Sequence, residues 1–274
     1  MANNPLQQYF RQPKIYIALP VSAVYSRPGT INSTDKMPIF GMTGMDELIL
    51  KTPDALLSGE STARVIASCC PAITDPWGLA NIEVDLIIVA IRIATYGNMM
   101  TVNHTCPHCQ AENEYEFDLG KLIEHFSKCK FSSSIAVDNL VIKIKPLDLK
   151  TANEFSLTTF ALQKKIIRVQ QMEDPDERDQ LATELIKELN QNQIKIIQSS
   201  IEQIDLADQV VTERAYILEF LNNCDRDVFE KIRLLFEENA AQWRIPPTPV
   251  KCTACDGDSS VQMELNQTNF FGGA

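Results

Sequence analysis

The sequence has little glycine and very little histidine, with 10 glycines and 3 histidines among 274 residues. It contains no Gly-rich phosphate loop, no His-Glu-x-x-His, no Gly-x-Ser-x-Gly and no dinucleotide-binding fingerprint. Phosphate cradles and acid–base chemistry usually depend on such parts. The composition therefore argues against an enzyme.

Long apolar runs are also missing. The longest unbroken one is Leu86 to Ile91, whereas a membrane-spanning helix needs about 20 apolar residues. The segment Met1 to Leu19 mixes Asn, Gln, Arg and Lys with its apolar residues, so it lacks the continuous core of a secretion signal. We expect neither membrane contact nor secretion.

Positive charge is scarce. The chain has 25 Lys and Arg against 36 Asp and Glu, which gives a net charge of −11 and a pI of about 4.8. Proteins that bind nucleic acid place Lys and Arg against the phosphates. We therefore expect no nucleic-acid binding.

Two Cys-x-x-Cys pairs are the most informative motifs present: Cys106 with Cys109, and Cys252 with Cys255. Alternating segments typical of strands flank both, namely Thr101–Asn103 and Tyr115–Leu119 around the first, and Pro249–Lys251 and Val261–Leu265 around the second. Four thiolates suit one tetrahedral Zn²⁺. We predict a split zinc ribbon with one structural Zn²⁺ per chain. The alternatives are a zinc-ribbon module that binds nucleic acid and a thiol redox protein.

The pattern along the chain predicts an α+β protein, mostly α-helical, in four parts. Residues 1–40 read as an extended, irregular N-terminal arm broken by Pro20, Pro28 and Pro38, and residues 41–98 as a helical domain. Residues 99–119 and 246–274 form the split ribbon with a C-terminal tail. Residues 120–245 read as an inserted β-hairpin plus helical bundle.

Within the insertion, Asp138-Asn139 is predicted to connect the hairpin strands Phe131–Val137 and Leu140–Lys145. A long helix is then expected from Asp176 through Ile204, because apolar residues recur there at helical spacing.

Two further features suggest contacts with a partner, each with an alternative. Asp85 and Arg92 lie seven positions apart and so share one face of a predicted core helix. They form either a solvated stripe or a polar contact to a partner or to the ribbon. Phe270-Phe271 either docks on the chain's own core or inserts into a partner.

Four segments resemble the T4-type baseplate hub proteins of contractile-tailed bacteriophages. They are Met42–Gly59, Ala90–Gly97, Cys106–Cys109 and Tyr115–Leu119. The resemblance implies a non-enzymatic late protein that builds, or helps assemble, the central hub of the baseplate. It also singles out Gly44–Gly59 and the helix around Arg92 as family features, and the first cysteine pair as metal ligands; the second pair is assigned from this sequence.

The resemblance further implies where the chain acts and with what. Other tail and baseplate proteins are the expected partners, and an oligomer around the tail axis is one arrangement. Asp46 and Glu47, inside the family segment, join Asp85, Arg92, Phe270 and Phe271 as candidate partner-binding residues. The expected location is the host cytoplasm during assembly. If the chain stays in the particle rather than leaving as an assembly chaperone, a second expected location is the tail baseplate of the virion.

Overall fold

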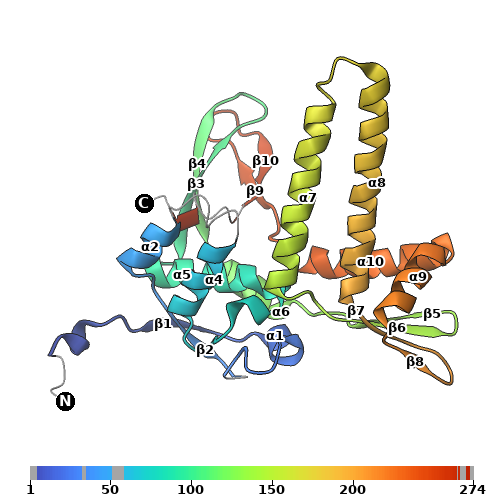
Figure 1. The fold of residues 1–274 in the computed structure, drawn as a ribbon. Coiled ribbons are helices and arrows are strands. Elements are labelled where there is room, and N and C mark those ends of the chain that lie inside the picture. Colours follow the sequence, from blue (N-terminus) through green and yellow to red (C-terminus); the bar gives the residue numbers. More distant parts are fainter. Residues whose placement is uncertain (1–4, 33–34, 51–58, 264, 266–269, 272–274) are drawn as a thin grey trace. The chain divides into compact units, whose positions relative to one another are not determined.

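The computed structural model describes residues 5–32, 35–50, 59–263, 265 and 270–271. They form two compact units of an α+β protein (Figure 1). The first unit comprises residues 1–79, 83–129 and 243–274, and the second comprises residues 80–82 and 130–242. Residues 51–58, which belong to the segment Met42–Gly59, lie outside the described residues. In the part that is described, no helix has the length and apolar character needed to cross a membrane.

The first unit combines short helices with three two-stranded sheets. Its elements are the 3-10 helix η1 (Pro5–Tyr9), β1 (Pro13–Ile17), α1 (Pro20–Tyr25), β2 (Met37–Phe40), α2 (Gly44–Leu50), α4 (Glu60–Cys69), the 3-10 helix η2 (Pro76–Gly78), α5 (Val84–Tyr96), β3 (Met99–Thr105), β4 (Glu112–Asp118), α6 (Gly120–Lys128), β9 (Thr248–Lys251) and β10 (Asp258–Val261). The 3-10 helix η3 (Asn81–Glu83) spans a boundary between the units.

Helix α5 is the centre of this unit. It is buried on nearly every side, and β1, β2, α4 and α6 all contact it. A helix that is apolar all round belongs inside a protein, so the predicted core helix is confirmed. Gly97 ends it with a φ of 93° and donates its N–H to the carbonyl of Ile93. Its ψ of 178° places this residue outside the αL conformation that commonly ends helices.

The prediction of irregular structure before residue 40 is wrong for two segments. Pro20 is the first residue of α1, where its fixed φ suits a helix start and its missing N–H costs no hydrogen bond. Strand β2 pairs antiparallel with β1, with Pro38 opposite Tyr16. Arg11 ties the preceding segment down through its guanidinium, which donates to the carbonyls of Gly41 and Ser68 at 2.7 and 2.6 Å.

The second unit joins a four-stranded antiparallel sheet, in the order β5-β6-β7-β8, to four helices. Its elements are β5 (Ser134–Val137), β6 (Leu140–Ile144), α7 (Leu149–Val169), α8 (Pro175–Ser200), β7 (Ile201–Asp205), β8 (Val210–Val211), α9 (Arg214–Asn223) and α10 (Arg226–Gln242). The predicted hairpin is confirmed, since Val137 pairs with Leu140 across a turn in which Asp138 has a φ of 53°.

The helix expected through Ile204 ends at Ser200, and β7 begins with the next residue. Ile201 and Ile204 are buried, and Ile142 of β6 lies opposite Ile204 in the sheet. The core therefore joins the sheet to α8, α9 and α10 and is not formed by helices alone. Its buried members are Val137, Ile142, Ile144, Ile197, Ile201, Ile204, Ile217, Leu221, Ile232 and Leu235.

Candidate metal centre

The two Cys-x-x-Cys turns are built on matching strand pairs. In β3–β4, Thr105 pairs with Glu112, and in β9–β10, Lys251 pairs with Asp258. In both strand pairs, the residue directly before the first cysteine pairs with the residue that stands three positions after the second cysteine. The strands after the cysteines thus begin earlier than predicted, at Glu112 rather than Tyr115 and at Asp258 rather than Val261.

The turns themselves also match. The N–H of Gln110 donates to the carbonyl of Cys106 at 2.9 Å, and the N–H of Asp256 donates to that of Cys252 at 3.0 Å. Gln110 and Asp256, which directly follow the second cysteine of each pair, have φ values of 59° and 54°. The site is therefore made of two copies of one local structure.

The four cysteine sulfurs meet between these turns. They all lie within 4.8 Å of one another. The sulfurs of Cys106 and Cys255 are 3.8 Å apart, and those of Cys109 and Cys252 are 3.6 Å apart. A tetrahedral ion with Zn–S bonds of about 2.3 Å would hold its sulfurs about 3.8 Å apart. The donor set and its spacing fit such an ion.

Asn113 supports the cluster from β4. Its side chain is buried, and its amide N–H donates to the Cys252 sulfur at 3.4 Å. Its oxygen accepts from the N–H and hydroxyl of Thr253 at 2.9 and 2.7 Å. Asn113 thus links the first strand pair to the second turn, a role that the sequence-based reasoning missed. The available signal was a polar residue at an inward position of an alternating strand.

The pKa values of the second cysteine pair diverge when no cation is present. The N–H of Ala254, with help from the Asn113 amide, lowers the pKa of Cys252 to about 6. The N–H of Gly257 lowers the pKa of Cys255, but the neighbouring thiols and the loss of solvent together raise it to about 12. Four thiolates repel one another at this spacing, and a divalent cation would remove the repulsion.

Further contacts fasten the two strand pairs to each other. His108 Nε2 lies 3.1 Å from the carbonyl of Asp258, and the Tyr115 hydroxyl donates to the carbonyl of Lys251 at 2.8 Å. A Cβ on Gly257 would lie 2.7 Å from His108 Cδ2 and 3.2 Å from the Cys255 sulfur. A larger residue at this position would displace the His108 ring from the cluster.

The other four cysteines lie apart from the cluster. Burial raises the pKa of Cys69 to about 12 and also raises that of Cys70. Loss of solvent likewise raises the pKa values of Cys129 and Cys224. Among the described residues, no second group of His, Cys, Asp and Glu side chains could hold a metal.

Most of the candidate partner-binding residues make contacts within the chain. Phe270 and Phe271 are 1% and 8% exposed, so of the two alternatives the pair docks on the chain's own core. Arg92 is buried and donates from Nε to the carbonyl of Phe270 at 2.8 Å. The Tyr96 hydroxyl donates to Glu47 Oε1 at 3.0 Å and to the carbonyl of Phe271 at 3.2 Å.

The remaining two candidates differ from each other. Asp46 is buried and accepts hydrogen bonds from the N–H and hydroxyl of Thr43 at 2.7 and 2.8 Å and from the Ser68 hydroxyl at 3.0 Å. It therefore caps the start of α2. Asp85 is exposed while Arg92 is buried, so the two do not form a solvated stripe. Contact of these six residues with another protein stays a prediction.

Fold and site together define an α+β protein of two units, one of which contains a four-sulfur cluster that brings together segments far apart in the sequence. The chain belongs to the T4 bacteriophage base plate protein family, whose model matches residues 42–272. The match includes both cysteine pairs and confirms the resemblance found in the sequence. Comparisons with curated proteins and with solved structures gave no significant match. Membership indicates a structural role in the phage tail, with other tail proteins as partners.

Proposed function

We propose that the chain is a structural or assembly protein of the central hub of the baseplate, stabilised by one Zn²⁺ and acting through protein contacts. One observation carries this proposal: the four-sulfur cluster lies entirely within the region that matches the baseplate family. The hub itself is proposed from the sequence resemblance.

The donor set favours a structural role for the ion. Four cysteine sulfurs fill a tetrahedral shell and leave no position for water or substrate. Zinc would also hold together two segments separated by the whole of the second unit, and closing such a loop otherwise costs conformational entropy. Cys106, Cys109, Cys252 and Cys255 are the proposed ligands.

The surface of the ribbon favours protein partners over nucleic acid. Glu112, Glu114, Glu116 and Asp118 alternate along β4 and are all exposed. Opposite them in the sheet stand Thr105, Asn103, Thr101 and Met99, none of which is basic. A phosphate backbone would be repelled by this face.

Metal analysis of the purified protein tests the zinc site. We expect one Zn²⁺ per chain, lost in Cys252→Ser and kept in the matched control Cys224→Ser, because Cys224 lies apart from the cluster. A protein without metal that forms a reversible Cys106–Cys109 disulfide would support the redox alternative instead.

A phage lacking this gene tests the hub assignment. We expect electron microscopy to show tails without a complete baseplate centre, restored by the wild-type chain supplied in trans. Detection of the chain in purified tails would identify a virion component, and detection only in infected cells an assembly factor. Normal baseplates in the absence of the gene would refute the proposal.

A further inference from the structure

Helix α7 has two apolar faces, and only one of them meets α8. The inner face is formed by Phe155, Thr159, Leu162, Ile166 and Val169, which recur at alternating intervals of four and three residues. All five are partly or fully buried, as expected for the seam of two helices packed side by side.

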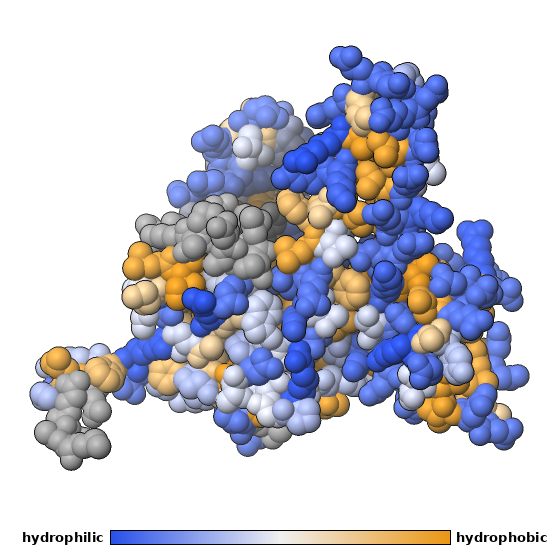
Figure 2. Space-filling view, viewed as in Figure 1, coloured by the Kyte–Doolittle hydropathy of each residue, from blue (hydrophilic) through white to orange (hydrophobic). Residues whose placement is uncertain are grey.

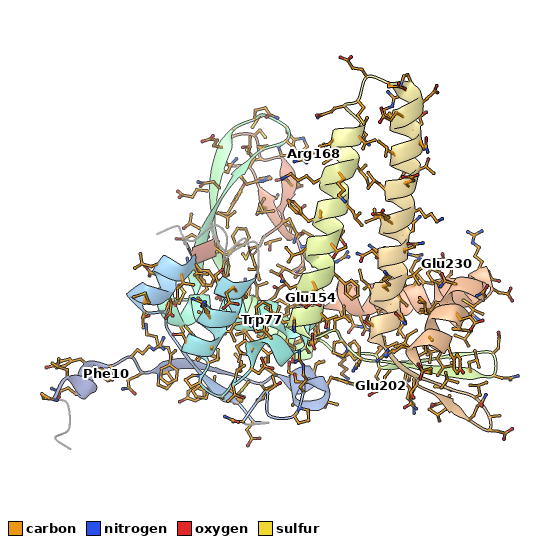
Figure 3. All side chains as sticks on the ribbon, in the orientation of Figure 1. Phe10, Trp77, Glu154, Arg168, Glu202 and Glu230 are labelled. Carbon is orange, nitrogen blue, oxygen red and sulfur yellow. The ribbon has the colours of Figure 1, made fainter. Side chains whose placement is uncertain are left out.

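The outer face carries three large apolar side chains in solvent. Leu157, Phe160 and Ile167 are 40%, 56% and 58% exposed. At about 100° per residue they fall on the side of α7 opposite the inner face. Figure 2 shows apolar side chains between the two helices of this hairpin, and Figure 3 labels Arg168 near the end of α7.

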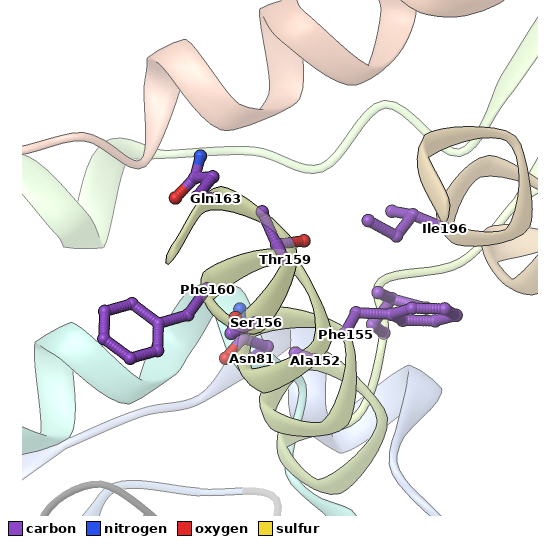
Figure 4. Close-up of a pocket in the computed structure, with 9 residues that line it drawn as sticks. Asn81, Ala152, Phe155, Ser156, Thr159, Phe160, Gln163 and Ile196 are labelled. Atoms are coloured by element: carbon purple, nitrogen blue, oxygen red, sulfur yellow. The ribbon is translucent and has the colours of Figure 1, made fainter. Parts of the chain in front are cut away.

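A groove adjoins this face. It has a volume of about 380 Å³ and no charged residue in its lining, which includes Ala152, Phe155, Phe160 and Ile196 (Figure 4). Phe160 forms one wall, so the groove and the outer face are continuous along α7. An isolated apolar side chain on a surface is ordinary, but a groove bordered by a helical stripe is typical of a helix-binding surface.

The charge of α7 is opposite to that of the chain as a whole. Residues 155–170 contain three bases, Lys164, Lys165 and Arg168, and no acid, whereas the chain has a net charge of −11. Among the described residues, none of these three bases forms an ion pair within 4.0 Å. Lys165 and Arg168 line a shallow pocket together with Glu184 and Glu188 of α8, whereas Lys164 does not. The face thus combines apolar contact area with basic side chains.

We propose that the outer face of α7, defined by Leu157, Phe160, Lys164, Ile167 and Arg168, binds an amphipathic helix of another protein. The bound helix would present apolar residues at three- and four-residue spacing and carry Asp or Glu beside them. It would lie against α7 as the third helix of a bundle with α7 and α8.

The charges argue against other occupants. Two copies of this chain meeting symmetrically through the face would bring bases against bases, which is unfavourable. A nucleic acid would leave the Phe160 and Ile167 side chains uncovered between its phosphate contacts. An acidic amphipathic helix would place carboxylates beside the basic side chains and cover the apolar side chains.

Binding of two synthetic helices to the full-length protein tests this proposal. Both peptides carry the same leucine repeat, one flanked by Glu and the other by Lys, and fluorescence anisotropy measures their affinities at low and high salt. We expect the Glu peptide to bind at least about tenfold more tightly than the Lys peptide, with the preference weakening as salt rises.

Surface variants locate the binding site. Phe160→Ser/Ile167→Ser should weaken binding of the Glu peptide by at least about tenfold. The matched control Ile186→Ser, which removes a 50% exposed side chain from α8, should leave binding unchanged. Lys164→Glu/Arg168→Glu should reverse the preference towards the Lys peptide. All these side chains are exposed, so the variants should fold, as circular dichroism would verify.

Several results would overturn the proposal. These are equal binding of the two peptides, no binding, or binding that survives Phe160→Ser/Ile167→Ser. Light scattering that shows self-association of the wild type and its loss in Phe160→Ser/Ile167→Ser would also overturn the proposal, because the occupant would then be a second copy of this chain. Preferential binding of duplex DNA would identify nucleic acid instead. The experiment does not test the zinc site, because the four cysteines belong to the first unit and α7 belongs to the second.

Discussion

At the scale of single residues, Asn113 illustrates how a metal site depends on side chains that do not bind the metal. Its amide N–H points at the Cys252 sulfur, and its oxygen holds the backbone and hydroxyl of Thr253. Such outer partners fix the orientation of a ligand and are commonly worth about 10- to 100-fold in metal affinity. Asn113 also provides the acceptor for the N–H and hydroxyl of Thr253.

We predict that Asn113→Ala weakens zinc binding by about 10- to 100-fold, measured by competition with a chromophoric chelator. The sulfur would lose a donor and the Thr253 turn would lose its acceptor. Asn103→Ala is the control, because Asn103 is exposed on the neighbouring strand. Equal affinities for both variants would show that Asn113 does not support the site.

Glu83 is a second buried polar residue with a defined task. Its two carboxylate oxygens accept the N–H groups of Val21 and Ser22 at 2.9 and 2.6 Å, at the start of α1. Burial nevertheless raises the pKa of this carboxyl, although the bonds to Val21 and Ser22 oppose the shift. The folded protein therefore holds this proton more tightly than the unfolded chain does.

The direction of the shift predicts how stability depends on pH. A carboxyl whose pKa is raised on folding stabilises the fold at low pH, and that contribution is lost as the pH rises through the folded pKa. Glu83→Gln does not titrate. We therefore expect the stability of wild type relative to Glu83→Gln to fall as the pH rises above about 4.5, by at most about 1.4 kcal/mol per pH unit.

Urea unfolding of both proteins at several pH values measures this difference. Acid release of zinc affects both proteins alike and cancels in the comparison. A difference that grows with pH would mean that the two N–H donors outweigh burial.

At the scale of elements, the sequence was most informative where a local pattern determines the structure. The Cys-x-x-Cys turns, the Asp138 hairpin and helix α5 are all governed by neighbours in the chain, and the structure has them close to the predicted positions. Asn113 was missed because its partners, Cys252 and Thr253, are distant in sequence. Contacts of that kind leave no local pattern.

Strand β7 shows the opposite situation. Ile196, Ile197, Ile201 and Ile204 have the spacing of a continuing helix, and periodicity alone favours that interpretation. The β-branched side chains after Ser200 suit a strand equally well, and pairing with β6 decides between the two. That pairing joins residues about 60 positions apart in the chain, as Ile142 with Ile204, so tertiary context overrides the local signal.

Helices α7 and α8 contain a polar pair within their apolar seam. Asn192 is 7% exposed and donates from its amide to the Thr159 hydroxyl at 2.9 Å. A single buried Asn in a helix seam typically fixes the register of the two helices at a cost in stability. The pair is placed where sliding of one helix along the other would break it.

We predict that Asn192→Ala and Thr159→Ala are coupled by about 0.5–1.5 kcal/mol in a double-mutant cycle of urea unfolding. Each substitution removes the same hydrogen bond, so the second should cost little once the first is made. Thr158→Ala replaces Thr159→Ala in the control cycle, because Thr158 is exposed and bonds its own helix. Additive effects of Asn192→Ala and Thr159→Ala would show that the bond contributes nothing.

At the scale of the whole molecule, the sulfur cluster and the apolar core of the β5–β8 sheet lie in different units. The sulfurs belong entirely to the first unit, whereas the ten buried residues that centre on the β5–β8 sheet belong entirely to the second. After the first cysteine pair, the chain enters the second unit at residues 129–130 and returns to the first unit at residues 242–243. Removing the metal should therefore affect the two units unequally.

We predict that a zinc chelator at neutral pH exposes the amides of β3, β4, β9 and β10 to hydrogen exchange, while β6 and β7 keep their protection. In small zinc-dependent domains, metal binding supplies on the order of 10 kcal/mol to folding. Strands β9 and β10 have only four residues each and pair only with each other, so they have little else to hold them.

Both tryptophans, Trp77 and Trp243, lie in the first unit, so their fluorescence reports on that unit alone. We expect chelation to change this signal and excess Zn²⁺ to restore it. Cys252→Ser should show the chelated behaviour without chelator, and Cys224→Ser should behave as wild type. Equal loss of protection in both units would mean that they unfold as one, because a cluster confined to the first unit would then be holding the second as well.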